Sequence, residues 1–350
     1  MKFFRLHGLK SQSLVLSIYV LIASVFAAPV AAQEQFYKGK TIRIVVGFSA
    51  GGGFDTYARA LSRHLGKHIA GNPTVIVENM VGAGSLIAAN HVFNVAKPDG
   101  LTIGHFIGGL FLGQVLGQKG VEFDARKFEF IGAPTTDHVV CAFTKASGIT
   151  SVEKWMASKT PVKMGGVGPG TSTPDNATRI IKATTVLPIQ LVSGYKGTAD
   201  IRLAAESGEL GGGCWGWESV KVTWRKALES GDAVVVLQAN RKNHPDLPKI
   251  PQAISLAKTD EGRKMIEVGI HGDSEIVRTY TLPPGTPKDR VQLLRAAFES
   301  ALKDPEFAAE GRKSELTVDF VSGPEAEKII SGLFKLDSAL TAKLKDVLYN

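Results

Sequence analysis

The stretch TIRIVVGFSAGGGFDTYARALSRHL, residues 41–65, indicates how this chain folds. Its first eight residues are mostly apolar and rich in β-branched side chains, which is typical of a strand buried on both faces. A glycine-rich bend follows, and Asp55 then stands where a helix N-cap is expected. Beyond it, Ala58, Leu61 and Leu65 recur at the spacing of one helix face. The stretch therefore predicts a strand, a tight turn and a helix in direct succession.

The same order of strand, glycine turn and helix recurs along the chain. Further strands are expected at residues 74–77, 101–107, 139–143, 162–167, 189–192 and 234–237, with another strand-to-helix passage at 211–217. Helix starts are indicated at Ser85 and at Thr173-Pro174-Asp175, which supply a cap, a proline and an acidic first turn. Strands that alternate with helices are typical of an α/β fold with a largely parallel sheet.

The chain crosses over near residue 132, where the first set of strands is complete and a second set begins. We expect two lobes: residues 33–138 and 239–350 form lobe 1, and residues 139–238 form lobe 2, inserted into it. A single large doubly wound sheet is the alternative that the same alternation allows.

The first 32 residues have the three-part layout of a secretory signal peptide. Basic residues form a positive leader, residues 14–26 are almost entirely apolar, and small residues end the segment at Ala32. The apolar run is about 13 residues, whereas a membrane anchor needs about 20. We therefore expect cleavage after Ala32 and a mature protein, residues 33–350, in the bacterial periplasm.

The mature chain is mildly basic and its charges are scattered. Removal of Lys2, Arg5 and Lys10 with the signal peptide lowers the formal net charge from +8 to +5. A net positive charge helps to attract anions. Because no dense Lys/Arg block interleaved with aromatic residues occurs, we expect no nucleic-acid partner.

Cysteine is sparse, with Cys141 and Cys214 as the only two. Two lone cysteines cannot complete a zinc site. In an oxidising periplasm they can form a disulfide, and two buried free thiols are the alternative. The sequence leaves both interpretations open.

No enzyme motif is complete in this sequence. The glycines at 51–53 lack the following Gly-Lys-Ser/Thr of a phosphate loop, residues 82–87 lack the third glycine of a dinucleotide fingerprint, and no G-x-S-x-G elbow occurs. His64 and His68 share one helix face, but no glutamate completes an H-E-x-x-H metal site. We therefore expect neither catalysis nor a bound metal or cofactor.

Glycine-rich turns that lead into helices can bind anions. The first N–H groups of a helix are unpaired and carry partial positive charge, and glycine lets a ligand approach the backbone closely. In open α/β sheets these turns lie at the carboxyl ends of the strands, where ligands bind. Two such turns that face each other from two lobes would clamp a small anion. Turns that only connect strands to helices are the alternative.

Short motifs spread over residues 37–348 share their order and spacing with one known family. They are, in chain order, Tyr37-Lys38-Gly39-Lys40-Thr41-Ile42-Arg43-Ile44-Val45-Val46, Val77-Glu78-Asn79, Val81-Gly82-Ala83-Gly84, Lys97-Pro98-Asp99-Gly100, Gly168-Pro169-Gly170-Thr171-Ser172, Gly194-Tyr195-Lys196-Gly197 and Pro283-Pro284-Gly285-Thr286-Pro287. Together they resemble the periplasmic receptors of tripartite tricarboxylate transporters, often called Bug proteins. The resemblance covers nearly the whole mature chain.

The resemblance implies a two-lobed periplasmic-binding-protein fold, type II-like and of the Venus flytrap kind, with lobes joined by crossing strands. It implies a receptor that captures a small organic carboxylate between the lobes and delivers it to integral-membrane transporter subunits. We expect a monomer without a cofactor. Presentation of the ligand to a membrane sensor kinase is the alternative for the partner.

Carried over by position, the resemblance implies ligand contacts from both lobes. Lobe 1 would contribute Phe48, Ser49, Ala50, Gly51, Gly52, Gly53, Phe54, Asp55, Gly84, Ser85 and His105. Lobe 2 would contribute Gly168, Gly170, Thr171, Ser172, Thr173, Tyr195, Lys196, Gly197 and Thr198. Backbone N–H groups and hydroxyls would hold the carboxylate, while Lys196 is either a charge in the site or a surface lysine.

The sequence departs from the family pattern where aromatic residues appear. Ala50 stands where the family usually has proline, and Phe54 where it has a small residue or threonine. Trp215 and Trp217 follow Gly211, near which an acidic residue is usual. Alternate residues of a strand point the same way, so both tryptophans face either the cleft or the core. In the cleft, with Phe54, they could hold a ring or an alkyl chain, which suggests an aromatic carboxylate among the mono- and dicarboxylates.

Overall fold

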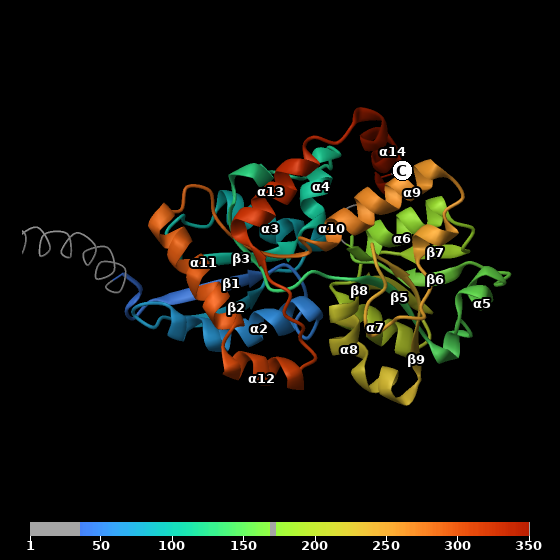
Figure 1. The fold of residues 1–350 in the computed structure, drawn as a ribbon, viewed down its shortest axis with the longest axis horizontal. Coiled ribbons are helices and arrows are strands. Elements are labelled where there is room, and N and C mark those ends of the chain that lie inside the picture. Colours follow the sequence, from blue (N-terminus) through green and yellow to red (C-terminus); the bar gives the residue numbers. More distant parts are fainter. Residues whose placement is uncertain (1–35, 169–172, 350) are drawn as a thin grey trace, which may run out of the picture.

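The computed structural model describes residues 36–168 and 173–349. The predicted signal peptide and the expected contact residues Gly170, Thr171 and Ser172 lie outside the described residues. Figure 1 shows two groups of strands, each covered by helices. Every helix in the described part is too short or too polar to cross a bilayer.

One sheet has six strands in the order β11-β4-β10-β3-β1-β2. Its strands are β1 (Thr41–Val46), β2 (Thr74–Asn79), β3 (Thr102–Ile107), β4 (Glu129–Ala133), β10 (Arg278–Leu282) and β11 (Val321–Ser322). β1 pairs in parallel with β2 and β3, whereas β10 is antiparallel to β3 and β4. The apolar run of β1 thus lies between two neighbouring strands, as its composition predicts.

The other sheet has five strands in the order β7-β6-β8-β5-β9. Its strands are β5 (Val139–Thr144), β6 (Val162–Gly165), β7 (Ile189–Val192), β8 (Gly212–Gly216) and β9 (Ala233–Ala239). β6 is parallel to β7 and β8, and β5 is antiparallel to β8 and β9. Both sheets therefore contain three parallel strands followed by an antiparallel one. Two sheets of this kind confirm the predicted two-lobed α/β fold and exclude the single-sheet alternative.

The helices surround the two sheets in separate groups (Figure 1). Around the first sheet lie α2 (Gly53–Leu65), α3 (Leu86–Asn94), α4 (Gly109–Val115), α11 (Lys288–Leu302), α12 (Pro305–Lys313) and α13 (Gly323–Leu333). Around the second lie α5 (Val152–Met156), α6 (Thr173–Thr184), α7 (Thr198–Glu206), α8 (Trp217–Ser230), α9 (Asp260–Ile266) and α14 (Ser338–Tyr349). A π-helical turn, η6 (Glu267–His271), joins α9 to α10 (Gly272–Ser274). The short 3-10 helices are η1 (Gly66–His68), η2 (Ala83–Ser85), η3 (Ala125–Lys127), η4 (Lys145–Ser147) and η5 (Ala253–Leu256).

Two expected helix caps are wrong in detail. α2 begins at Gly53, so Asp55 lies inside its first turn and not at the N-cap. Its carboxylate instead accepts a hydrogen bond from the Gly51 N–H at 2.9 Å, which closes the glycine bend. Ser85 occupies the N-cap of α3 but makes no capping bond. Its Oγ accepts from the Ile107 N–H at 3.2 Å and so ties the turn to β3.

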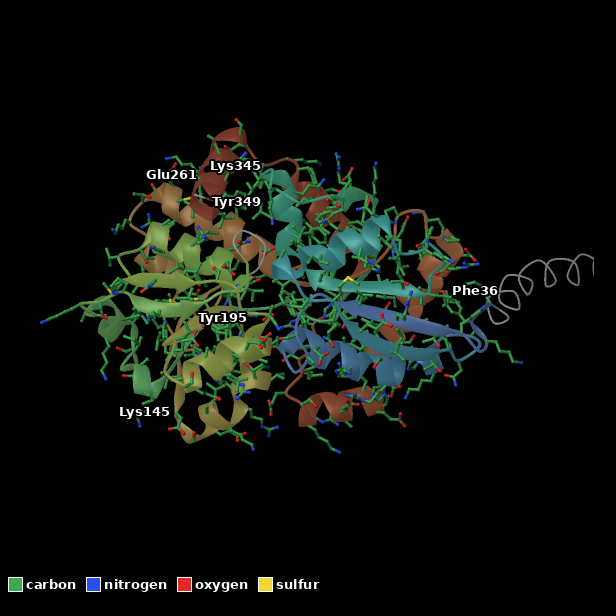
Figure 2. The ribbon with its side chains drawn as sticks, turned by 180° about the vertical axis from the view of Figure 1, so that it is seen from behind. Phe36, Lys145, Tyr195, Glu261, Lys345 and Tyr349 are labelled. Carbon is green, nitrogen blue, oxygen red and sulfur yellow. A yellow bond between two sulfur atoms is a disulfide. The ribbon has the colours of Figure 1, made fainter. Side chains whose placement is uncertain are left out.

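The chain passes between the two sheets at residues 134–138 and again between β9 and β10. The helices α9 and α14 both pack on α6, which lies beside the second sheet. Figure 2 shows Glu261 of α9 close to Lys345 and Tyr349 of α14. We therefore propose that the lobe boundary at residue 239 holds for the strands, while these C-terminal helices cover lobe 2.

A disulfide joins Cys141 to Cys214, so the alternative of two free thiols does not hold. The two residues face each other directly in the antiparallel pair β5 and β8. The bridge therefore fixes the strand that ends at Trp215 and Gly216 to the strand that enters lobe 2.

Candidate functional site

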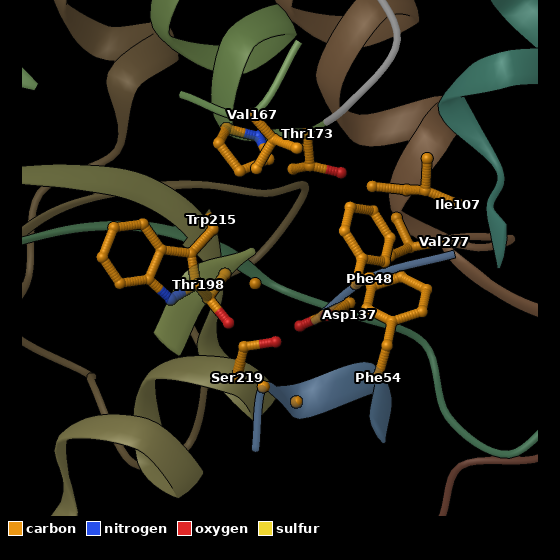
Figure 3. Close-up of a pocket in the computed structure, with 14 residues that line it drawn as sticks. Phe48, Phe54, Ile107, Asp137, Val167, Thr173, Thr198, Trp215, Ser219 and Val277 are labelled. Atoms are coloured by element: carbon orange, nitrogen blue, oxygen red, sulfur yellow. The ribbon is translucent and has the colours of Figure 1, made fainter. Parts of the chain in front are cut away.

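A narrow pocket lies between the two sheets, at the ends of strands from both (Figure 3). The described residues that line it are Phe48, Gly52, Gly53, Phe54, Ile107, Asp137, Val167, Thr173, Pro174, Thr198, Trp215, Gly216, Ser219 and Val277. Most come directly after β1, β3, β6 and β8 or belong to the first turns of the helices that follow. The carboxyl ends of parallel strands are where α/β sheets bind ligands.

Four helices begin at this pocket. Gly53 starts α2 and Thr173 starts α6, while Thr198 starts α7 and Ser219 lies in the first turn of α8. The first N–H groups of each helix lack partners within the helix and carry partial positive charge. Four helix starts that meet at one pocket favour an anion there. None of the described lining residues is Lys, Arg or His.

Asp55 organises the glycine bend on the lobe 1 side. Its carboxylate accepts from the Gly51 N–H, from Arg59 Nε at 2.8 Å and from Asn79 Nδ2 at 2.9 Å. Burial alone would raise the pKa of Asp55, but these hydrogen bonds and the charge of Arg59 hold it below its usual value. The oxygens of Asp55 are thus engaged inside lobe 1, and its role is to shape the bend.

The two lobes touch each other beside the pocket. The Ser49 N–H donates to the Lys196 carbonyl at 3.2 Å, and Ser49 Oγ donates to Asp200 Oδ2 at 2.7 Å. The hydroxyl of Tyr57 on α2 donates to Glu218 Oε2 on α8 at 2.9 Å. These hydrogen bonds connect lobe 1 to the starts of α7 and α8.

Glycines allow this approach of the lobes. A Cβ on Gly53 would lie 2.1 Å from Ser219 Oγ and 2.8 Å from Ser219 Cα. A Cβ on Gly197 would lie 2.6 Å from Ser49 Oγ, and one on Gly52 would lie 3.3 Å from Thr198 Oγ1. The bends were expected to let a ligand approach the backbone. The structure shows that they also let the opposite lobe approach it.

A fully buried ion pair lies at the base of the pocket. Asp137 Oδ2 accepts from Arg278 Nε at 3.0 Å and from Arg278 Nη2 at 2.8 Å. Its Oδ1 accepts from the N–H groups of His138 at 3.0 Å and Glu218 at 3.3 Å. Burial raises the pKa of the Asp137 carboxyl, and the charge of Arg278 opposes that rise. Arg278 Nη2 also donates to Ser219 Oγ at 2.7 Å, so the pair connects β10 to α8.

Phe54 lies between this pair and His105. The Arg278 guanidinium carbon is 4.7 Å from the centre of the Phe54 ring, and the His105 ring is 4.9 Å from it. His105 stacks on Tyr280 at 4.0 Å, and its Nδ1 is 3.0 Å from the Thr279 carbonyl oxygen. Burial lowers the pKa of His105 to about 3, so its ring is neutral at neutral pH. His105 therefore supports Phe54 from behind and does not line the pocket.

The family model for the tripartite tricarboxylate transporter family receptor matches residues 57–344. The chain belongs to this receptor family. The family consists of periplasmic solute-binding receptors and not of enzymes.

Solved receptors of this kind have the same fold. The periplasmic binding protein BugD superposes with a TM-score of 0.71 at 22% identity, covering 89% of this chain and 98% of that one. MatC from Rhodopseudomonas palustris, solved with bound malate, gives a TM-score of 0.67 at 20% identity and covers 88% of this chain and 99% of that one. A second R. palustris protein, solved with adipate, superposes with a TM-score of 0.69 at 20% identity, and the match covers 88% of this chain and 97% of that one. At these identities the likeness concerns the fold.

Relatives known from sequence carry the name UPF0065 protein. One from Agrobacterium vitis is 28% identical over 301 residues, which cover 82% of this chain and 79% of that protein. One from Bordetella bronchiseptica is 36% identical over 126 residues, or 35% of this chain and 36% of that protein. One from Cupriavidus necator is 42% identical over 77 residues, or 22% and 23%. The last two matches thus span about a third and about a quarter of the relatives' own length.

Seven of the nineteen predicted contact residues that the structure describes line the pocket. Those that line it are Phe48, Gly52, Gly53, Phe54, Thr173, Thr198 and Trp215. Those that do not line it are Ser49, Ala50, Gly51, Asp55, Gly84, Ser85, His105, Gly168, Tyr195, Lys196, Gly197 and Trp217. Lys196 is exposed and contributes its carbonyl to the contact between the lobes, while the hydroxyl of Tyr195 donates to Glu209 Oε1 at 2.5 Å.

The expectation that Trp215 and Trp217 point the same way is wrong. β8 ends at Gly216 and α8 begins at Trp217, so the two-residue alternation of a strand does not continue past Gly216. Trp215 lines the pocket, whereas Trp217 donates its Nε1–H to Asp246 Oδ2 at 3.0 Å. Of the three aromatic residues that suggested an aromatic ligand, Phe54 and Trp215 remain, and Phe48 joins them.

Sequence reasoning missed half of the lining residues. They are Ile107, Asp137, Val167, Pro174, Gly216, Ser219 and Val277. Ile107 ends β3, whereas Val167 lies two residues after β6, which ends at Gly165 and not at residue 167 as expected. Their position at or just past a strand end could have identified them. Asp137 carries no local signal, because its role depends on Arg278, which is 141 residues away in sequence.

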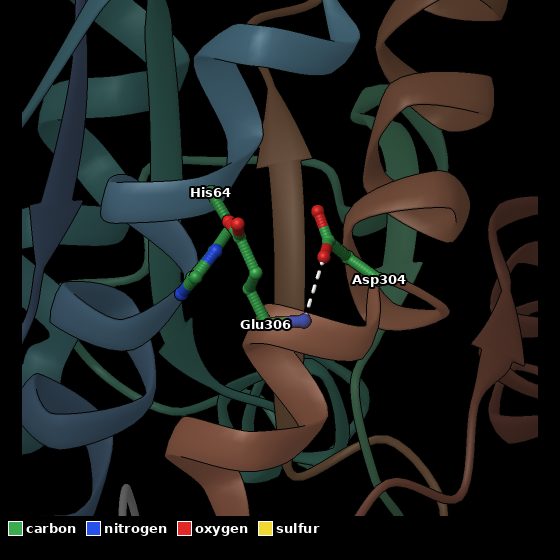
Figure 4. Close-up of side chains that lie close together, drawn as sticks. All are labelled: His64, Asp304 and Glu306. Carbon is green, nitrogen blue, oxygen red and sulfur yellow. Dashed lines mark hydrogen bonds between the residues drawn. The ribbon is translucent and has the colours of Figure 1, made fainter.

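A second polar cluster joins α2 and η1 to α12, away from the pocket. His64, Asp304 and Glu306 bring one ligand atom each within 4.8 Å of one another (Figure 4). Lys67 Nζ lies 2.6 Å from Asp304 Oδ2 and 2.5 Å from Glu306 Oε2, and it lowers the pKa of Asp304. His68 Nε2 lies 2.9 Å from the same Asp304 oxygen. The carboxylates thus already have a cation between them, and the cluster fastens α12 to α2.

Proposed function

We propose that this receptor captures a small organic carboxylate in the pocket between its lobes and delivers it to a tripartite tricarboxylate-type membrane transporter. The observation that carries the proposal is the meeting of four helix starts at a pocket between the lobes. These neutral donors suit an anion that must later be released, because they attract it without a buried ion pair. The malate and adipate seen in two receptors of the same fold support a carboxylate as the ligand.

Closure of the lobes around the ligand is the mechanism that we propose. Gly53 and Phe54 approach the ligand from lobe 1, while Thr173, Thr198 and Trp215 approach it from lobe 2. A ligand shifts an open–closed equilibrium only by binding the closed state more tightly. Contacts from both lobes supply that difference, and the membrane partner would then recognise the closed form. The predicted signal peptide supports a periplasmic location for this cycle.

A thermal-shift screen of residues 33–350 tests the carboxylate proposal. The protein is first unfolded and refolded to remove any ligand that co-purifies. A carboxylate at about a hundred times its dissociation constant stabilises by roughly 2.7 kcal/mol, which raises the melting temperature visibly. We expect increases with some aliphatic or aromatic carboxylates and none with the matching primary amides or amines. A panel in which no carboxylate raises the melting temperature would contradict the proposal.

Gly53→Ala tests closure. The added methyl group would collide with Ser219 of the opposite lobe, and overpacking of this kind costs about 1–3 kcal/mol. We expect affinity for the best carboxylate of the screen to fall by roughly tenfold to a hundredfold in calorimetric titrations. Gly332→Ala is the control, because a Cβ at Gly332 in α13 meets nothing within 4 Å. Equal affinities of the two variants would contradict closure through this contact.

A further inference from the structure

The described residues that line the pocket offer no positively charged side chain to a second carboxylate. Among the described lining residues the single ionisable side chain is the acid Asp137. Its counter-ion Arg278 is fully buried and stacks on the rings of Phe54 and Tyr57 at 4.7 and 4.9 Å. Each charge is therefore engaged by the other, and the acid is the one that faces the pocket. Burial of a further charge without a partner is unfavourable.

Two neutral donors in the lining have no acceptor. The Nε1–H of Trp215 and the hydroxyl of Thr173 make no hydrogen bond in the described part of the chain. Their residues are 1% and 6% exposed, so solvent does not satisfy them. A buried donor without an acceptor is unfavourable. Because both residues line the pocket, they indicate a ligand that brings an acceptor group to them.

The opposite side of the pocket is apolar. Figure 3 shows Phe48, Phe54, Ile107 and Val277 grouped on one side of the pocket, with Trp215 across from them. Phe48 and Phe54 pack against each other with ring centres 4.6 Å apart. A wall of this kind favours a ring or a branched alkyl group over a second charged group.

We propose that this receptor selects monocarboxylates with an apolar, ring-sized body and discriminates against dicarboxylates. This proposal rests on the carboxylate-receptor function proposed above. Trp215 Nε1–H and the Thr173 hydroxyl, with the adjacent helix starts, bind the carboxylate. Phe48, Phe54 and Val277 contact the body. A second carboxylate would meet this wall or the acid Asp137 and would lack a cation.

Calorimetric titration with matched ligand pairs tests this selectivity. The pairs are 4-methylbenzoate against terephthalate and hexanoate against adipate, which differ mainly in the second carboxylate. We expect the monocarboxylate of at least one pair to bind at least tenfold more tightly than its partner. Dicarboxylates that bind equally or more tightly would overturn the selectivity and leave the carboxylate-receptor function intact. Absence of binding by every carboxylate would overturn both.

Two substitutions with matched controls test the anchoring groups. Trp215→Phe and Thr173→Val remove the donors and keep most of the side-chain volume. Trp224→Phe and Thr178→Val are the controls, because these side chains are at least as buried, have no hydrogen-bond partner in the described part of the chain and do not line the pocket. We expect roughly tenfold weaker monocarboxylate binding for each test variant, as for a lost hydrogen bond to a charged group, and less than about twofold change for each control. Test variants that bind like their controls, with melting temperatures that show all four to be folded, would overturn the assignment.

Discussion

Asp137→Ala is expected to lower the free energy of unfolding by about 3–5 kcal/mol. The substitution leaves the Arg278 guanidinium, which is 0% exposed, without a counter-ion in the interior. It also removes the acceptor for the N–H groups of His138 and Glu218. Removing one member of a buried, hydrogen-bonded ion pair lowers the free energy of unfolding by far more than the intact pair contributes to it. The reason is that the remaining charge stays buried without a partner and away from water. Urea denaturation at neutral pH measures the loss.

Arg126→Ala is the matched control for this experiment. Arg126 pairs with Asp124 at 2.9 Å, but its side chain is 56% exposed. Pairs at the surface contribute roughly 0–1 kcal/mol. If Asp137→Ala were no more destabilising than Arg126→Ala, the buried pair would not hold the base of the pocket as described.

Removal of the disulfide is expected to have the second large effect. The double substitution Cys141→Ala and Cys214→Ala opens a loop with a sequence separation of 73 residues. Closing a loop of this length restricts the unfolded chain by an amount that corresponds to about 4 kcal/mol. We therefore expect a loss of that size in urea denaturation under oxidising conditions.

The effect of a reductant on the free energy of unfolding is the control for the disulfide experiment. Wild-type protein should lose stability when a reductant is added, whereas the double variant should be unchanged by it. Since Cys214 directly precedes Trp215, the same change loosens the strand that positions this pocket residue. A wild-type protein whose unfolding is insensitive to reductant would contradict the bridge.

The parts of the fold that depend on local sequence could be predicted. The passage from β1 through the glycine bend to α2 is encoded within residues 41–65 by an apolar run, glycines and helical spacing. The helix start at Thr173 follows from a similar local pattern, and Thr173 lines the pocket. Local signals of this kind act over one or two turns, which is why they place elements well.

The parts that depend on contacts between distant segments could not be predicted. Asp137 acquires its role from Arg278, and Gly53 acquires its role from Ser219 on the other lobe. Neither contact produces a regular spacing of residues that could be recognised in the sequence. Trp217 was misplaced because β8 ends one residue earlier than a continuous strand would require. The resemblance to receptors of the family located the region of the site but did not separate lining residues from supporting ones.

The position of the bound carboxylate in a crystal structure of the complex tests the central claim most directly. The protein would be crystallised with the tightest-binding monocarboxylate from the titrations. We predict one carboxylate within hydrogen-bonding distance of Trp215 Nε1 and Thr173 Oγ1, with the body of the ligand against Phe48 and Phe54. A carboxylate paired with Arg278 in place of Asp137, or a ligand bound outside the pocket between the lobes, would contradict the account.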